Sequence, residues 1–180
     1  GMSGSPIYIH TERGDALLGA IGYVFAQSDH SVALVTPIAD MRTADGATTF
    51  VGHVPGYGAA VPVATPILLA GASERTARLL EPLFQDSRLS LLPVQSGGTA
   101  PNALDHAHEL VPGSAIAVSL ISGAVQMSAV GTVTTVEDGR ILAFGHPLLG
   151  LGEATLPFVP AYVTSILPSL QVPFKLANVG

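Results

Sequence analysis

The sequence contains no cysteine among its 180 residues. A disulfide framework, a thiolate zinc site and a cysteine nucleophile are therefore excluded, and cysteine usage gives no indication of the redox compartment. Basic side chains are also few, because Lys175 is the single lysine and 7 basic against 13 acidic residues leave a formal net charge of −6. Since counterion release from nucleic acid needs a basic stripe, no nucleic-acid partner is expected.

Long apolar runs are missing as well, although 48% of the residues are hydrophobic. The 20 glycines and 14 prolines interrupt every apolar stretch before it approaches the roughly 18 residues that a membrane-spanning helix needs. No membrane-spanning segment is therefore expected in this chain. Only 11% of the residues are charged, so the apolar content is high enough to offset chain entropy, and we expect a packed globular fold.

Strand and turn signals alternate in the first half of the chain. In residues 7–24, two apolar stretches flank a polar turn at Thr11–Asp15, which predicts a β-hairpin. Val32–Val35 predicts a further strand. Gln95–Pro101 is rich in serine, glycine and proline and is our candidate linker, so we divide the chain into segments 1–94 and 102–180.

Two short helices are expected among these strands. Thr36 and Pro37 are typical of a helix start, with threonine at the N-cap and proline at the first helical position, and this helix should run through Met41. Ser73 is placed to cap a second helix, which Pro82 should bend or end.

The second half of the chain is strongly β. Its predicted strands, rich in valine, isoleucine and threonine, are Ala115–Ile121, Val125–Val136 and Ile141–Phe144. Asp138 and Gly139 predict a tight hairpin turn between the last two, because both suit backbone positions with positive φ. The pattern as a whole predicts a mostly β protein, built as one or two small β-barrels or a sandwich with a few short helices.

The segment Gly1-Met2-Ser3-Gly4-Ser5-Pro6 combines glycine, serine and proline in a way that strand packing does not require. In serine peptidases of chymotrypsin type, the nucleophile lies in a turn of the form G-x-S-G-x-P, whose backbone N–H groups converge on the developing oxyanion. Ser3 would be the nucleophile, and the N–H groups of Gly1 and Ser3 would form the oxyanion hole. A plain glycine-serine turn before a strand is the alternative.

His146 lies in the segment Phe144-Gly145-His146-Pro147, directly after a predicted strand. A loop histidine beside a rigid sheet is a reasonable general base. A surface or hydrogen-bonded structural histidine is the alternative, since the chain contains 6 histidines.

Four stretches together resemble the SpoIVB-type serine peptidases. They are GMSGSPIY at Gly1–Tyr8, LLGAIGYVF at Leu17–Phe25, VTPIADM at Val35–Met41 and GTVTTVEDGRILAFGHPLLG at Gly131–Gly150. The first three follow one another as at that family's nucleophile end, and the fourth is similar to its histidine end.

The resemblance implies a serine endopeptidase with Ser3 as nucleophile and His146 as base. It also implies a chymotrypsin-like fold of two small β-barrels with the active site between them, a protein or peptide substrate, and no metal or cofactor. Because the SpoIVB peptidase acts outside the cytoplasmic membrane, an extracytoplasmic or cell-envelope location is expected from the resemblance alone. The oligomeric state is left open.

The chain departs from the family pattern in two respects. In the type member the histidine precedes the serine, whereas here Ser3 comes first, so the chain is either a rearranged relative or a fragment whose two ends belong to different copies of the domain. The family's acid lies upstream of the serine turn, before this chain begins. The available aspartates Asp40, Asp105 and Asp138 do not inherit that position, and Asp40 and Asp138 are interpreted as helix and turn residues.

These departures keep a second function open, that of a catalytically inactive β module used for binding or tethering. A small-molecule hydrolase with the same residue pair is a third possibility. A separation of about 3 Å between the Ser3 hydroxyl and the His146 ring favours catalysis. His106 and His108 have a spacing that could hold a divalent metal on a strand, but a solvated polar segment is the preferred interpretation, so no metal site is expected.

Overall fold

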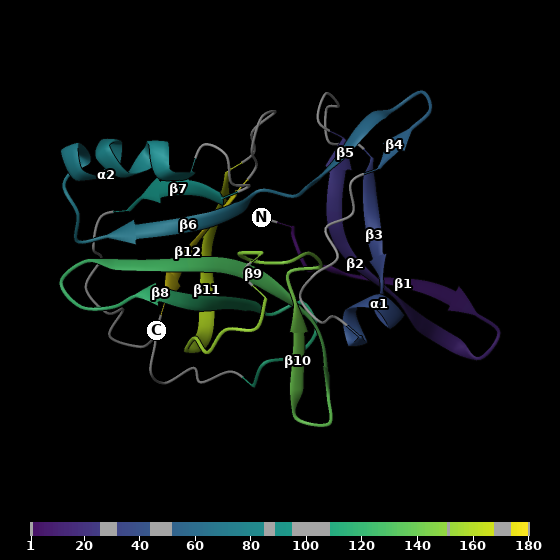
Figure 1. The fold of residues 1–180 in the computed structure, drawn as a ribbon. Coiled ribbons are helices and arrows are strands. Elements are labelled where there is room, and N and C mark those ends of the chain that lie inside the picture. The colour runs from purple at the N-terminus through teal and green to yellow at the C-terminus, as the bar shows by residue number, and fades with distance from the viewer. Residues whose placement is uncertain are drawn as a thin grey trace.

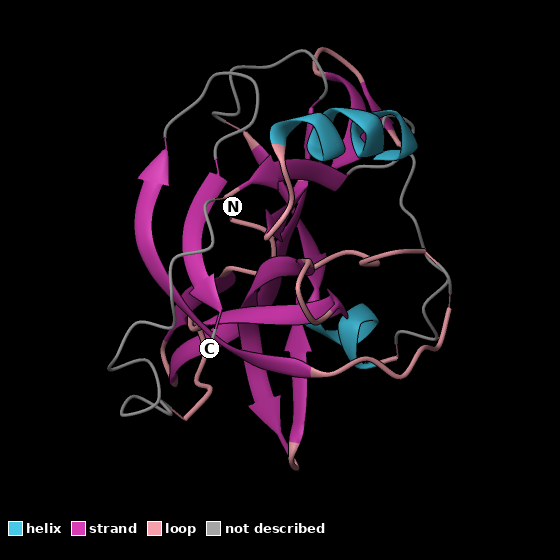
Figure 2. Cartoon of the chain, turned by 90° about the vertical axis from the view of Figure 1, so that its left-hand side faces the viewer, coloured by secondary structure: helices cyan, strands magenta, loops and turns pink. Residues whose placement is uncertain are grey.

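The strands of this protein form two sheets. The computed structural model describes residues 2–25, 32–43, 52–84, 89–94, 109–150, 152–167 and 174–179. Figure 2 shows that strands make up most of the described chain and that helices are few. The predicted mostly β class is confirmed.

The first sheet is built from the N-terminal strands. Its members are β1 (Pro6–Thr11), β2 (Gly14–Phe25), β3 (Ala33–Pro37), β4 (His53–Val54) and β5 (Gly58–Pro62), and α1 (Ile38–Arg42) follows β3. The long strand β2 is central, because β1, β3 and β5 all pair with it in antiparallel register. Strands β1 and β2 form the predicted hairpin, with Thr11 opposite Gly14.

The second sheet contains the remaining strands in the order β12-β11-β8-β9-β6-β7, with β10 paired to β9. Their bounds are β6 (Thr65–Ala70), β7 (Leu89–Pro93), β8 (Ala115–Ile121), β9 (Gln126–Glu137), β10 (Arg140–Ala143), β11 (Phe158–Leu167) and β12 (Phe174–Val179). Strands β6 and β7 are parallel and are joined through α2 (Glu74–Leu80) and the 3₁₀ turn η1 (Glu81–Phe84). Figure 1 shows the two sheets on opposite sides of the view, with α2 beside β7.

The strand pairing divides the chain differently from our prediction of segments 1–94 and 102–180. Strands β6 and β7 belong to the second sheet, so the change of sheet falls between Pro62 and Thr65. The physical reason is that the apolar strand β6 pairs with β9, a partner nearly 60 positions away, and such long-range pairing leaves no local signal. The predicted linker 95–101 lies outside the described residues.

Neither sheet closes on itself within the described residues. The strand order of each sheet has two ends that do not pair with each other. The chymotrypsin-like barrels therefore remain a prediction from the resemblance. The described part of the chain also contains no helix with the length and apolar content that crossing a bilayer requires.

Most local signals act as predicted. Ser73 caps α2, and its side chain accepts the Thr76 N–H at 3.2 Å. Pro82 follows the end of α2 and lies in η1, as expected for a residue that lacks an N–H donor. Asp138 and Gly139 have φ values of 50° and 74° in the turn between β9 and β10, which suits a tight hairpin.

The predicted N-cap at Thr36 is wrong. Helix α1 begins at Ile38 with Pro37 at the cap position and without a side-chain cap. Thr36 is still a strand residue opposite Ala20. Its hydroxyl donates instead to the Gly145 carbonyl of the second sheet at 2.5 Å, so a long-range partner has replaced the local one.

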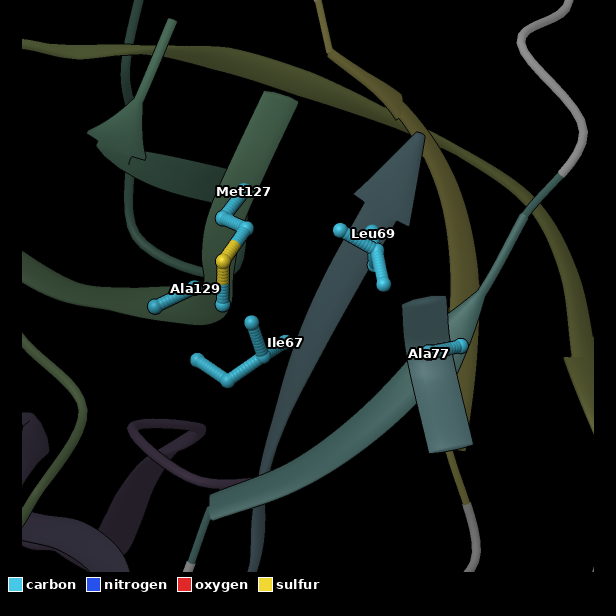
Figure 3. Packing of buried hydrophobic residues seen from close by; sticks show 5 residues of the cluster. All are labelled: Ile67, Leu69, Ala77, Met127 and Ala129. Atoms are coloured by element: carbon cyan, nitrogen blue, oxygen red, sulfur yellow. The ribbon is translucent and has the colours of Figure 1, made fainter. Parts of the chain in front are cut away.

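Apolar side chains of β6, β9 and α2 form a core on one face of the second sheet. Figure 3 shows Ile67, Leu69, Ala77, Met127 and Ala129 in this core, and each is at most 5% exposed. Residues two apart on a strand face the same side, so each strand contributes a pair of side chains to the core. This packing holds β9, the strand beside which the candidate site is built.

Leu69→Ala should lower the free energy of unfolding by about 3 kcal/mol, because it leaves a cavity in this core. Leu79→Ala is the matched control, since Leu69 is 1% exposed and Leu79 is 70% exposed; this change should stay within about 0.5 kcal/mol. Urea denaturation followed by circular dichroism measures both. Equal losses for the two leucines would contradict the assigned packing.

Candidate active site

The candidate site lies where β9 changes partner along one edge. Strand β6 pairs with residues 126–129 of β9, and β10 pairs with residues 133–137. Between these stretches, the Thr132 carbonyl accepts the Phe144 N–H at 3.2 Å. The serine turn of the first sheet fits against this point so closely that a Cβ on Gly4 would lie 2.3 Å from Thr132 O.

Ser3 lies in a tight turn that precedes β1. The Ser5 N–H donates to the Met2 carbonyl at 3.0 Å, and Gly4 has a φ of +84°. Together these features are typical of a type II turn with Ser3 at its second position and Gly4 at its third, where a positive φ is required. The glycine that follows the serine is thus needed both for the turn and for its contact with β9.

His146 follows a second sharp turn, at the end of β10. Phe144 and Gly145 have φ values of +69° and +66°. This conformation suits glycine but costs an ordinary residue about 1–2 kcal/mol. The Phe144 ring packs over Gly131, where a Cβ would lie 2.4 Å from a ring carbon. The buried ring therefore holds the backbone that directs His146 towards the first sheet.

The two turns bring Ser3 and His146 into contact. The distance from Ser3 Oγ to His146 Nε2 is 2.7 Å, across 143 positions of chain. Ser3 Oγ also donates to the Phe144 carbonyl, and Thr65 Oγ1 lies 3.4 Å from His146 Nε2. The predicted proximity of serine and histidine is therefore present.

The environment of His146 favours a neutral imidazole with an unprotonated Nε2. Burial lowers the pKa of His146, and the hydrogen bond to the Pro147 backbone acts in the opposite direction. His146 Nδ1 lies 3.0 Å from the Pro147 carbonyl oxygen, which can only accept, so Nδ1 carries the proton in this contact. Nε2 is then the nitrogen with a lone pair facing Ser3.

The Pro147 carbonyl has the position that a carboxylate holds in a serine–histidine–aspartate triad. Among the described residues, no carboxylate contacts His146. Asp40 lies on the exposed side of α1, and Asp138 lies in the exposed hairpin turn, as predicted. Asp105 lies outside the described residues. A carbonyl fixes the tautomer and ring orientation as a carboxylate does, but it stabilises an imidazolium less.

Two threonines connect the turns across the sheets. Thr36 of β3 donates to the Gly145 carbonyl at 2.5 Å, and Thr134 of β9 donates to the Gly4 carbonyl at 2.7 Å. Each sheet thus contributes one hydroxyl to the turn of the other sheet. Contact is possible only because β2 carries Gly22, where a Cβ would lie 2.2 Å from Gly145 O.

The predicted oxyanion hole is described in part. Gly1 lies outside the described residues, so only the Ser3 N–H can be placed. The next amide along the chain, that of Gly4, donates to the Ile21 carbonyl at 2.8 Å. The Gly4 N–H is therefore already used in a hydrogen bond within the protein. The Ser3 N–H is the amide of the described turn that could donate to a substrate oxyanion.

The other described histidines do not join the site. His10 lies 2.9 Å from Asp15 in the exposed β1–β2 hairpin, and His53 is exposed in β4. His106 and His108 lie outside the described residues. The described residues contain no group of three or more potential ligands that could hold a metal ion.

Sequence reasoning missed four residues that build the site's surroundings: Thr36, Thr65, Thr134 and Lys175. Lys175 Nζ donates to Thr132 Oγ1 at 3.0 Å, and burial lowers the pKa of this ammonium group. The segment Gly131-Thr132-Val133-Thr134, which belongs to the fourth stretch of the resemblance, was a signal for Thr134 but does not identify the acceptor of its hydroxyl. Thr36 depends on a contact between the sheets, and Thr65 and Lys175 depend on contacts between distant segments of the second sheet.

Comparison of the chain with protein-family models, with curated proteins and with solved structures finds no match in any of the three.

Proposed function

We propose that this protein is a serine endopeptidase of SpoIVB type, with Ser3 as nucleophile and His146 as general base. The observation that carries the proposal is the 2.7 Å contact between Ser3 Oγ and His146 Nε2, which is within reach for direct proton transfer. The proposal includes a chymotrypsin-like relation between two β units with the site between them, and a protein or peptide substrate.

In the proposed reaction, Ser3 Oγ attacks a peptide carbonyl carbon while His146 Nε2 takes the hydroxyl proton. The carbonyl oxygen becomes an oxyanion that the Ser3 N–H, together with Gly1, would stabilise. The tetrahedral intermediate then expels the amine, which receives the proton from His146. Water attacks the resulting acyl-enzyme with His146 again as base, releasing the acid and restoring the serine.

The resting site is closed. Ser3 is 1% exposed, so a substrate reaches Oγ only after the neighbouring chain moves. The same movement must release the serine hydroxyl from the Phe144 carbonyl, because the proton passes to His146 only along their shared hydrogen bond. Phe144 is in a strained backbone conformation, and leaving that conformation would offset part of the free energy of opening.

The burial of Ser3 also favours a second candidate function, a non-catalytic interaction module. In that function, the serine–histidine contact would simply join the two sheets. A buried hydroxyl whose proton is already donated to the Phe144 carbonyl is fully compatible with such a structural role. The reactivity of the Ser3 hydroxyl distinguishes the two functions, because only a peptidase needs Ser3 to act as a nucleophile.

Labelling with a small ethyl fluorophosphonate probe tests the nucleophile. Wild-type protein should be labelled at Ser3, Ser3→Ala should not be labelled, and His146→Ala should react about 10³–10⁴-fold more slowly because its base is lost. Ser5→Ala is the matched control, since Ser5 lies in the same turn without contacting His146, and it should react like wild type. Equal labelling of wild type and Ser3→Ala would rule out the proposed nucleophile.

The labelling rate should depend on pH through His146. Because burial lowers the pKa of this imidazole, the neutral, active form should persist below the ordinary value of about 6.5. The rate should therefore stay level from pH 8 to 6.5 and fall only as the pH drops through the lowered pKa. Stability should fall as the pH drops from about 6.5 towards the lowered pKa, since over that range the unfolded chain binds the proton more readily.

His10, which is exposed in the β1–β2 hairpin, provides the control for this pH profile. His10→Ala should leave the acid limb of the labelling rate where it is in wild type. An acid limb centred above pH 6.5 would contradict a buried neutral base.

Thr36→Val and Thr134→Val test the connections between the sheets. Each change removes a hydroxyl at nearly constant shape and leaves a partly buried carbonyl unpaired, which should cost about 1–3 kcal/mol of stability. Displacement of either turn should slow labelling of Ser3 by about 10–100-fold. Thr11→Val is the matched control, because Thr11 makes the same kind of bond to Gly14 in an exposed hairpin. Similar slowing by all three variants would refute the positioning role.

A further inference from the structure

A cavity of about 450 Å³ adjoins the histidine turn. Its lining includes Phe144 and Pro147, the residues two before and one after His146. The Phe144 carbonyl accepts from Ser3 Oγ, and the Pro147 carbonyl faces His146 Nδ1. The cavity therefore begins at the same two residues that hold the serine–histidine pair.

The side chains that line the cavity are all apolar, and the polar surface of its walls comes from the backbone. Ile116 and Val118 of β8 and Ile141 of β10 form its wall on the sheet side, and Leu148 and Leu156 close it from the segment that follows His146. All remaining lining residues are apolar or glycine, so the walls carry no charged side chain. A volume of this size lies within the range of about 300–1,000 Å³ that ligand pockets occupy.

The cavity opens onto an exposed apolar stretch of β11. Phe158 also lines the cavity and is 52% exposed. Phe158 pairs with Val118 of β8, which places both on the same face of the sheet. Tyr162, four positions further along β11, points to that face as well and is 63% exposed. An extended apolar segment could thus continue from the cavity along this face.

We infer that this cavity is the pocket for a large apolar side chain of the peptide substrate, that of the residue whose carbonyl Ser3 attacks. The inference rests on the proposed function and adds a substrate class to it. Leucine or phenylalanine at this position would be buried against apolar walls, whereas lysine or glutamate would lose its hydration without a partner.

Peptidyl diphenyl phosphonates of the form Ala-Ala-Pro-Xaa test the pocket, because they react with the active serine while presenting the Xaa side chain. Phenylalanine and leucine reagents should inactivate Ser3 about 100-fold faster than alanine, lysine or glutamate reagents. The small ethyl fluorophosphonate, which has no such side chain, reports on the serine independently.

The pocket itself is altered by Ala154→Trp, which places a ring at an exposed lining position. This change should lower the rate of the phenylalanine reagent relative to that of the alanine reagent at least 10-fold. Ala16→Trp in the exposed β1–β2 hairpin is the matched control, and it should keep the wild-type preference.

The outcomes separate the two levels of the proposal. If the small probe labels Ser3 but the phosphonates show no preference for apolar side chains, or do not react, the pocket assignment is wrong and the serine peptidase survives. If Ala154→Trp leaves a phenylalanine preference unchanged, that preference arises elsewhere and the pocket assignment is again wrong. If the small probe fails to label Ser3, the proposed function falls, and the pocket assignment falls with it.

Discussion

The close approach of two backbones at the junction of the sheets is the constraint on which the site depends. The serine turn and the histidine turn meet at positions where a Cβ would collide with main-chain atoms, and glycine occupies these positions at Gly4, Gly22 and Gly145. The hydroxyls of Thr36 and Thr134 then satisfy the carbonyls of Gly145 and Gly4. Neither sheet could position its half of the residue pair without the other.

The same junction sets the electrostatic state of the pair. A partly buried histidine between two sheets keeps a neutral ring because burial disfavours the cation. Its Nδ1 proton is directed to the Pro147 carbonyl, so the chain supplies the orienting acceptor from its own backbone. Outside this buried region, the Arg42–Glu137 pair, at 2.8 Å, joins α1 to the end of β9. It is partly exposed and adds orientation to the junction more than stability.

Much of the local structure could be predicted from the sequence, because its causes are local. The β1–β2 hairpin, the Ser73 cap and the Asp138-Gly139 turn follow from residues within a few positions of one another. The contact between Ser3 and His146 was predicted from a resemblance and not from periodicity or spacing. The residues that hold this contact could not be predicted. Thr36 was assigned as a helix N-cap from the proline that follows it, but its hydroxyl donates to a carbonyl 109 positions away.

The membership of β6 and β7 in the second sheet could not be predicted either, because it also depends on a long-range contact. Apolar strands carry no mark of which sheet they will join, and the pairing of β6 with β9 is decided by packing across the whole chain. Gly22 illustrates the point at a single residue. Its position in β2 suggests tight strand packing, but only the structure reveals that the tight neighbour is the carbonyl of Gly145.

The 143 positions between Ser3 and His146 have a consequence for how the protein acquires its site. Hairpins such as β1–β2 and β9–β10 close short loops and can form early, whereas the serine–histidine contact joins residues 143 positions apart and needs both sheets in place. After dilution from denaturant, strand content should therefore recover before the pair assembles.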